Sequence, residues 1–503
     1  MKIDGLFQSP AKYVADFARI QTILYRHDAS LQDYFHPLQM DTLDTPRASS
    51  RELNRANGIR SSALHRAFRL GASGSRRRIK TDVLICPNQH FGRRSETLFF
   101  FRTVLGVAET GARILCLIPD GTPARDELEA LLSAAGRKGQ VEYLDVTATA
   151  NPVEARVAPR MAKKRAHDAF EQTVQLLEPH GLGVGREMIY HFEHRARYVD
   201  AWERIAPSID FDAAIVRCHW QSVSSSLCRT AAERGKTSIT YQQGVIGHTL
   251  DVPVTTSKYV AFGDASAYFL AQCDRRFFEA VGKPQPPVEY INGGCLFDTI
   301  FDLRDQFDQR SLLLVDIPAG QSDFYGVEEQ CAGLLELAER LLAADLPLRK
   351  IIIRPHPFWS DLNFEGCHRL IRKYPLQCEL SHPSWSLEDD MRRSSIVAGI
   401  FSGVLTVAAA CGLPTIFLQT KNGYSTGDLD CFSPDQTLLP DAAFRHIAKA
   451  LSDPEAYADA QTVAMQNARS YYADGKNLDF GAASFERLLR TETATAARQG
   501  SAK

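Results

Sequence analysis

The sequence lacks the cysteine patterns that bind metals or build a disulfide framework. Its 503 residues include eleven cysteines, an odd number, and they are scattered without a C-x-x-C pair. Structural zinc needs Cys and His ligands at short spacing, so we expect no metal site. Several cysteines lie in apolar runs, as small buried side chains do in a reducing compartment: Cys86, Cys116, Cys218 and Cys411.

Long apolar runs and a strong charge imbalance are also absent. No run approaches the about 20 apolar residues of a membrane-spanning helix, and the opening Met1-Lys2-Ile3-Asp4 does not resemble a secretory signal. The 58 basic and 60 acidic residues give a formal charge of −2, which offers nucleic acid no overall attraction. We therefore expect a cytoplasmic protein without a nucleic-acid partner, and a peripheral contact with a membrane stays open.

What the chain does contain is a regular alternation of apolar strands and helices. The pattern predicts strands at 82–86, 113–118, 141–146, 213–216, 237–241, 258–262 and 288–291, with helices at 95–111, 128–135, 160–205 and 224–234. It restarts with strands at 311–315, 350–353, 396–400 and 415–418 and helices at 327–344, 361–374, 387–393 and 404–411. Such alternation predicts parallel sheets covered by helices on both faces.

The length of the chain exceeds the size at which one hydrophobic core keeps growing, so two domains are expected. We predict an α/β fold of two Rossmann-like, doubly wound parallel-sheet domains that face each other across a cleft. The domains span 81–295 and 311–490, and helices after residue 441 close the second. Residues 1–80 are predicted to be a partly helical extension, with a basic segment at 60–80, and 491–503 a disordered tail.

Arg354-Pro355-His356-Pro357 is the most informative motif of the chain. It follows the apolar strand 350–353, and its prolines present Arg354 and His356 on a stiff loop. Open α/β sheets bind ligands at the carboxyl ends of their strands, where this loop lies. A cation and an imidazole at that position favour a negatively charged ligand.

Two more strand ends of the second half offer polar groups. The loop after 311–315 carries Gln321 and Asp323, and Ser402-Gly403 stands where a strand passes directly into a helix. Free backbone N–H groups at a helix start bind anions, and glycine allows a phosphate to approach the backbone. Ser402 alone would be explained as a helix cap. Together with Arg354 and His356, it predicts a phosphate site between these loops.

These motifs resemble the donor half of GT-B glycosyltransferases. The matching parts are Ile351-Ile352-Ile353-Arg354-Pro355-His356-Pro357, Ser402, and the Ala-rich segment 408–414 that ends in Gly412-Leu413-Pro414. The combination is similar to capsule Kdo transferases, bacterial polysialyltransferases and CDP-glycerol glycerophosphotransferases. The resemblance implies that His356 and Ser402 contact the phosphate of a cytidine-nucleotide donor, with Arg354 and Gly403 beside them. It implies no catalytic metal and no cofactor, because the nucleotide sugar is a substrate.

The first half departs from this pattern at the catalytic base. Gln243-Gly244 stands where the family often has a histidine or acidic residue before glycine, and an amide takes no proton at neutral pH. The candidate bases are His248, Asp251, His90 and Glu96, while Gln243 and Gly244 are expected on the acceptor side. Val407 replaces a ribose-binding glutamate of many GT-B enzymes, so Gln321 or Asp323 would bind the ribose. Trp385 is interpreted as a nucleobase-stacking or a packing residue.

The resemblance implies transfer of a sugar or polyol phosphate from a nucleotide-activated donor to a growing bacterial surface polysaccharide. The acceptor would be a glycan or a lipid-linked glycan, reached at the cytoplasmic face of the inner membrane. Two alternatives stay open. One is a nucleotide-sugar 2-epimerase-like isomerase on the same fold. The other is a non-catalytic relative that binds a glycan or a partner protein, which the Gln243 and Val407 departures favour.

Overall fold

The computed structural model describes the greater part of the chain. The described residues are 10–34, 78–86, 94–118, 124–147, 152–182, 186, 189–220, 222–242, 252–293, 310–317, 327–355, 365–382, 385–400, 402–418, 437–472, 490 and 491. Their strands form two large parallel sheets and one short pair, β1 (Ile79–Lys80) with β5 (Ile209–Asp210).

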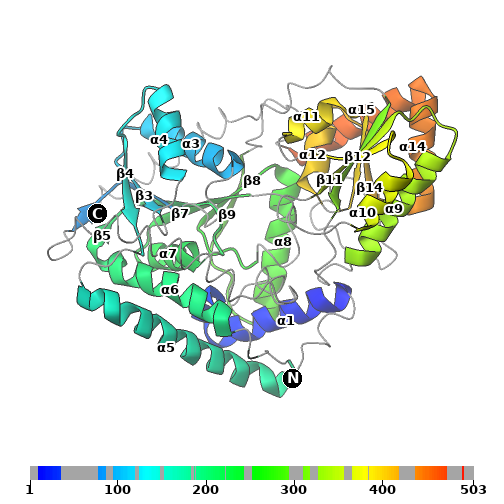
Figure 1. Ribbon diagram of the computed structural model, residues 1–503. Coiled ribbons are helices and arrows are strands. Elements are labelled where there is room, and N and C mark those ends of the chain that lie inside the picture. The colour runs from blue at the N-terminus through cyan, green and yellow to red at the C-terminus, as the bar shows by residue number, and fades with distance from the viewer. Residues whose placement is uncertain are drawn as a thin grey trace.

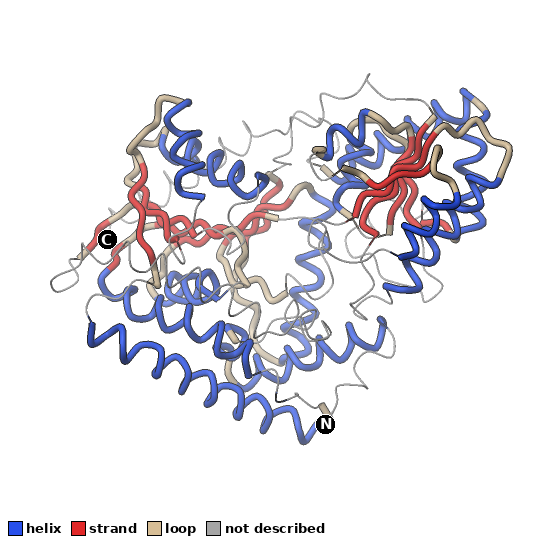
Figure 2. Tube along the Cα trace, viewed as in Figure 1, coloured by secondary structure: helices blue, strands red, loops and turns tan. Residues whose placement is uncertain are grey.

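The strands of both large sheets are drawn in red in Figure 2. The first sheet has seven strands, and every neighbouring pair is parallel. Its order is β4 (Val141–Asp145), β3 (Ile114–Ile118), β2 (Val83–Cys86), β6 (Ala213–Val216), β7 (Thr237–Tyr241), β8 (Lys258–Ala261) and β9 (Glu289–Asn292). The central strands β2, β3 and β6 are buried along their whole length. Continuous apolar runs of this kind belong to a sheet covered on both faces.

Helices cover both faces of the first sheet (Figure 1). On one face, α3 (Arg94–Ala108) and α4 (Ala124–Ala134) pack on β2 side chains such as Val83 and Ile85. On the other face, α6 (Ile189–Ile205) and α7 (Ser222–Glu233) pack on Leu84 and Cys86. Helix α8 (Asp264–Val281) covers β8 on that side, and α5 (Pro152–Leu177) lies outside α6. Short 3-10 turns η3 (Glu178–His180) and η5 (Ala206–Ser208) end α5 and α6.

The N-terminal helix belongs to the first domain in its packing. Helix α1 (Pro10–His27) lies on α8, where Arg26 donates hydrogen bonds to the carbonyls of Ala280 and Val281. The turn η1 (Ala29–Asp33) ends at the buried Asp33, which pairs with Arg229 and accepts a hydrogen bond from Ser225 on α7. A buried carboxylate needs such partners, so they hold this segment against the domain.

The second sheet has six strands, also all parallel. Its order is β12 (Cys378–Leu380), β11 (Lys350–Pro355), β10 (Ser311–Ile317), β13 (Ile396–Gly399), β14 (Thr415–Leu418) and β15 (Thr437–Leu438). Helices α9 (Val327–Ala343), α10 (Glu365–Lys373) and α14 (Pro440–Ser452) pack on one face. Helices α11 (Leu387–Arg392), α12 (Gly403–Ala410) and α15 (Pro454–Tyr471) pack on the other.

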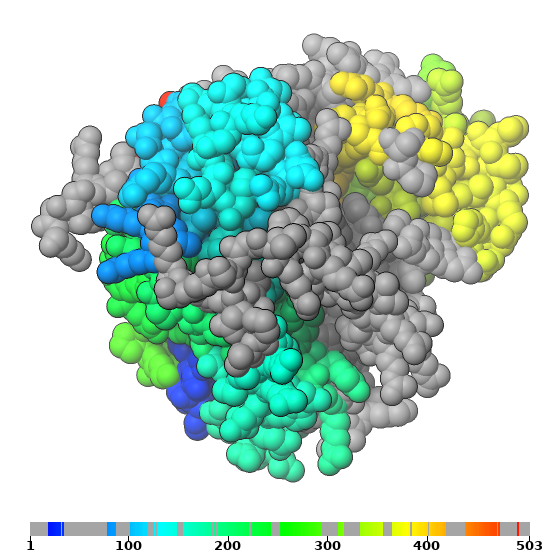
Figure 3. Space-filling view, turned by 60° about the vertical axis from the view of Figure 1, so that its left-hand side comes forward, coloured from blue at the N-terminus to red at the C-terminus, as the bar shows by residue number. Residues whose placement is uncertain are grey.

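The predicted α/β class with two doubly wound parallel sheets is confirmed. In Figure 3 the cyan and green residues of the first domain and the yellow residues of the second gather in two separate parts of the surface. The first sheet lies within 81–295 and the second within 311–490, and the exact domain boundaries stay predictions. The strand and helix order was predicted largely as observed. The sequence analysis missed α8 and the edge strands β12 and β15. The predicted basic segment at 60–80 and the tail at 491–503 fall almost entirely outside the described residues.

Candidate anion-binding site at the start of α12

The order of strands in the second sheet marks where a ligand would bind. From β10 the chain adds β11 and β12 on one side, then returns to place β13, β14 and β15 on the other. The switch point of this doubly wound sheet therefore lies between β10 and β13. Open α/β sheets bind ligands outside the carboxyl ends of the strands at such a point. Helix α12 begins just beyond the end of β13, at this position.

Ser402 caps α12, as its sequence position predicted. Its backbone is extended, and its Oγ accepts a hydrogen bond of 3.1 Å from the N–H of Val404. The N–H of Leu405 donates to the Ser402 carbonyl at 3.1 Å. The remaining N–H groups of a first helical turn have no intrahelical acceptor and carry the positive end of the helix dipole. The start of α12 is thus a local positive end at the switch point.

The two glycines beside this helix start have different surroundings. A Cβ on Gly399, the last residue of β13, would come within 2.7 Å of Val315 Cγ2, so glycine is required for β13 to pack against β10. Among the described residues, a Cβ on Gly403 would meet nothing within 4 Å. Packing within this part of the chain therefore does not explain a glycine at residue 403. The open space beside its backbone suits the close approach of an anionic ligand.

Arg354 lies at the same level of the sheet, one strand from the switch point. It pairs with Val315 across β11 and β10. Its Nη1 donates to Ser381 Oγ at 3.2 Å and forms an ion pair with Asp390, a fully buried residue of α11. Nη1 also donates to the carbonyls of Trp385 and Ser386, at 3.4 and 3.3 Å.

These contacts fix the Arg354 side chain without using all of its donors. Within the described part of the chain, Nε and Nη2 of Arg354 make no hydrogen bond, and the side chain keeps 21% of its surface exposed. Asp390 thereby holds the guanidinium in place and neutralises one charge. The free edge of the guanidinium is the part that could bind a phosphate.

Trp385 packs against a cation. The guanidinium of Arg393 lies 3.9 Å from the centroid of its ring, and Arg393 pairs with Glu379 on β12. One face of the indole is thus occupied. The predicted stacking on a nucleobase would have to use the other face and stays a prediction.

Most of the other predicted site residues lie outside the described residues: His90, Gln243, Gly244, His248, Asp251, Gln321, Asp323 and His356. Glu96 belongs to α3, and its side chain is likewise not described. Their predicted roles stay predictions. Of the predicted phosphate-binding residues, the structure describes Arg354, Ser402 and Gly403. Arg354 lies at the carboxyl end of β11, and the other two follow the carboxyl end of β13 in the same sheet.

Sequence reasoning missed a second arginine at a switch point. The first sheet switches between β2 and β6, and Arg217 directly follows β6. Its Nη1 donates to the carbonyls of Tyr241 and Gln242, at 3.4 and 3.2 Å, and its guanidinium lies over the Tyr241 ring. The signal was available, because an arginine after a buried apolar strand is also what singled out Arg354. Arg217 fixes the end of β7, where the predicted acceptor-side loop begins.

His219, two residues further, is buried beside Thr255. Its Nδ1 lies 3.3 Å from Thr255 Oγ1, and its Nε2 finds no hydrogen-bond partner among the described residues. Burial lowers the pKa of this imidazole to about 3, so it is neutral at physiological pH.

Among the described residues, no group of three or more His, Cys, Asp or Glu side chains has an arrangement that could hold a metal ion. None of the described helices combines the length and the apolar character that crossing a membrane requires.

Comparison with known proteins gives likeness in structure only. No family model and no curated protein sequence matches the chain. Among solved structures, it is similar to trehalose 6-phosphate synthase from Burkholderia multivorans, with 10% identity, coverage of 84% of this chain and 99% of that one, and a TM-score of 0.49. The UDP-GlcNAc 2-epimerase from Neisseria meningitidis bound to UDP-GlcNAc has 14% identity, coverage of 83% and 100%, and a TM-score of 0.46. A Rickettsia africae glycosyltransferase has 10% identity, coverage of 83% and 98%, and a TM-score of 0.47. The activities in these names belong to those proteins.

Proposed function

We propose that this protein is a glycosyltransferase that uses a nucleotide-activated donor and binds the donor phosphates at the start of α12. The observation that carries the proposal is the coincidence of three features at one sheet edge. The switch point lies between β10 and β13, a capped helix start with open space at Gly403 stands there, and Arg354 is fixed at the same level. A phosphate would satisfy the free amides and the guanidinium together.

The chemistry follows from the charge at this edge. Sugar transfer breaks the bond between the anomeric carbon and a donor phosphate oxygen, so negative charge builds on the leaving nucleotide. The positive end of α12, Arg354 and the neighbouring His356 stabilise that charge. A base on the first-domain side takes the proton of the acceptor hydroxyl as the new glycosidic bond forms. We propose a cytidine-linked donor and a bacterial surface glycan as acceptor, on the resemblance of the 351–357 and 402–414 motifs.

Gly403→Asp is the most specific test of the site, because it should lower nucleotide affinity without lowering the stability of the fold. An acidic residue in the first turn interacts favourably with the helix dipole, and none of the described residues obstructs a side chain there. The free energy of unfolding is expected to stay unchanged or rise by up to about 1 kcal/mol. The same carboxylate repels a phosphate, so nucleotide affinity should fall at least about tenfold.

The measurement is a thermal-shift and calorimetric panel with CMP, CDP, UDP and GDP. Gly403→Asn is the matched control, because it has nearly the same shape without the charge and should bind more tightly than Gly403→Asp. His356→Ala, repeated in the same panel, should lose much of the stabilisation that the preferred nucleotide gives. Wild-type protein that responds to none of the four nucleotides, or Gly403→Asp that binds as tightly as Gly403→Asn, would contradict the proposal. Exchange of the C2 hydrogen of UDP-GlcNAc with solvent would instead indicate an epimerase.

A further inference from the structure

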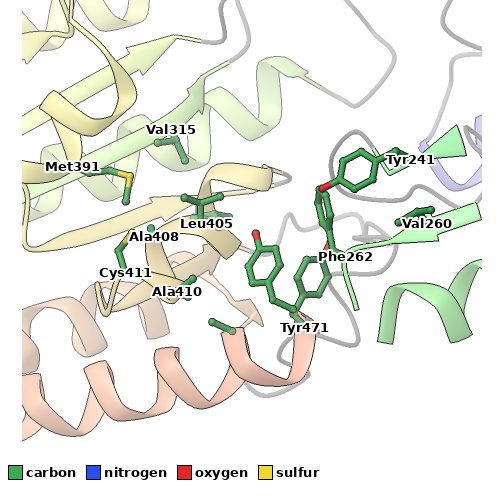
Figure 4. Close-up of a cluster of buried hydrophobic side chains, with 14 of the residues drawn as sticks. Tyr241, Val260, Phe262, Val315, Met391, Leu405, Ala408, Ala410, Cys411 and Tyr471 are labelled. Atoms are coloured by element: carbon green, nitrogen blue, oxygen red, sulfur yellow. The ribbon is translucent and has the colours of Figure 1, made fainter. Parts of the chain in front are cut away.

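Helix α15 brings two tyrosines to the first sheet. It ends at Tyr471, and both Tyr471 and Tyr472 contact Phe262, the residue after β8. Figure 4 shows Tyr471 and Phe262 near each other. The ring centroids lie 6.3 Å apart for Tyr471 and Phe262 and 5.6 Å apart for Tyr472 and Phe262. All three residues are nearly fully buried. We call Phe262, Tyr471 and Tyr472 the tyrosine junction.

The hydroxyl of Tyr472 points back to the second domain. It lies 2.6 Å from Thr406 Oγ1 in the first part of α12. Thr406 Oγ1 also donates a hydrogen bond of 2.8 Å to the carbonyl of Gly403. A threonine hydroxyl has one proton, so Thr406 must accept from Tyr472 if it donates to Gly403. The hydrogen bonds therefore run from the Tyr472 O–H to Thr406 Oγ1, and from the Thr406 O–H to the Gly403 carbonyl.

This pair of hydrogen bonds ends at the first peptide group of α12. The Gly403 carbonyl shares its peptide group with the N–H of Val404, which Ser402 caps. Hydrogen bonds in a chain polarise one another, and the effect is larger in a buried environment. A tyrosine held by the first sheet thus acts on the helix start to which the donor phosphate is assigned.

The other tyrosine faces the first domain. Tyr471 Oη accepts a hydrogen bond of 3.4 Å from Gln242 Nε2, and Gln242 Oε1 accepts one of 2.7 Å from the N–H of Phe262. Gln242 immediately precedes the predicted acceptor-side pair Gln243-Gly244, and Arg217 holds its carbonyl. The junction therefore joins the strand ends of the first sheet to the first turn of α12.

We propose that Tyr472 is a positioning residue that couples phosphate binding at the start of α12 to the carboxyl edge of the first sheet. The inference rests on the proposed function, because it concerns the same anion site. Packing alone does not account for the geometry. A phenylalanine would fill the same space against Phe262, whereas the hydroxyl adds the contact with Thr406.

The test compares nucleotide affinities of conservative variants by calorimetry. Tyr472→Phe keeps the ring and removes the hydroxyl, and Thr406→Val removes the next link at nearly constant volume. Each should weaken binding of the preferred nucleotide by about three- to tenfold, the usual worth of one hydrogen bond. Because both changes break the same chain, the double variant should bind about as well as either single one. Thr406→Ser, which keeps the hydroxyl, should bind like the wild type.

Tyr457→Phe is the matched control. Tyr457 lies on the same helix, and its hydroxyl donates to the Ser395 carbonyl at 3.0 Å, away from the start of α12. It should lower stability without changing nucleotide affinity. Wild-type protein that binds a nucleotide, with Tyr472→Phe binding equally well or no worse than Tyr457→Phe, would overturn the inference alone. Wild-type protein that binds no nucleotide would overturn the proposed function and the inference with it.

Discussion

At the residue scale, buried polar side chains show how the fold selects protonation states. His219 is neutral because burial removes the water that would stabilise its charge, which lowers its pKa. Arg354 is instead held by a buried partner, since its guanidinium forms an ion pair with the carboxylate of Asp390. Among the described residues, Arg354 uses only Nη1 for its contacts, so the other edge of its guanidinium can bind a ligand.

His219 gives a pH dependence of stability with a defined sign. In the unfolded chain a histidine takes up a proton below about pH 6.5, whereas the folded His219 does so only near pH 3. The unfolded state therefore binds more protons in this window, and the contribution present above pH 6.5 is lost as the pH falls. The expected slope is at most about 1.4 kcal/mol per pH unit.

Urea unfolding between pH 7 and pH 5 measures this slope. His219→Gln, which carries no titratable group, should show a flatter dependence than the wild type. His446, which is exposed on α14 near Lys449, also has a lowered pKa, so His446→Gln is the control for a second contribution of the same sign. Equal slopes for the wild type and His219→Gln would show that His219 is not the group responsible.

At the element scale, the contact between β10 and β13 sets where α12 begins. The two strands pair through Leu312, Leu313 and Leu314, and Gly399 lies against Val315 just beyond that register. A side chain at residue 399 would push the strands apart at the switch point. The start of α12, and with it the proposed anion site, would shift with β13.

Gly399→Ala should lower the free energy of unfolding by about 1–3 kcal/mol, the usual effect of overpacking a core. It should also weaken nucleotide binding, since the first turn of α12 shifts. Gly403→Ala is the natural comparison, because its Cβ meets none of the described residues within 4 Å and stability should not fall. The measurement is the urea concentration at the midpoint of unfolding for each variant. An unchanged midpoint for Gly399→Ala would contradict the argument that a side chain at residue 399 pushes β13 away from β10.

At the scale of the whole molecule, one continuous cluster of buried side chains runs through both sheets. It includes Tyr241, Val260 and Phe262 of the first domain and Val315 and Leu405 of the second. The tyrosine junction connects the two parts, with Phe262 between Tyr241 and the pair at the end of α15 (Figure 4). Since the cores are joined, the two domains should unfold together.

Removing the junction should uncouple the domains. The wild type is expected to show one thermal transition by calorimetry, and Tyr471→Ala combined with Tyr472→Ala should show two, because each truncation removes a buried aromatic contact worth about 3–5 kcal/mol. Tyr268→Ala is the control, since that tyrosine of α8 is 67% exposed and contributes little to the core. A single transition in the double variant, at whatever temperature, would show that the domains are coupled elsewhere.

The sequence by itself determined the local elements and the most informative motifs. Apolar periodicity predicted most strands and helices, and the Ser402 cap of α12 also follows from a local signal. Such features depend on neighbours in the chain, so a sequence pattern is sufficient for them. Helix α8 was not predicted, although the glycines at its two ends, Gly263 and Gly282, are local signals of a helix boundary.

Only the tertiary structure decided which strand ends become neighbours. The switch points, the Arg354–Asp390 pair and the tyrosine junction all join residues that are far apart in the chain. A buried charge takes whichever partner the packing brings to it, and a tyrosine hydroxyl binds whichever donor or acceptor lies within reach. Sequence periodicity describes one element at a time and carries no information on those distances, which is why Asp33, Arg217 and Tyr472 acquired their roles only in the folded molecule.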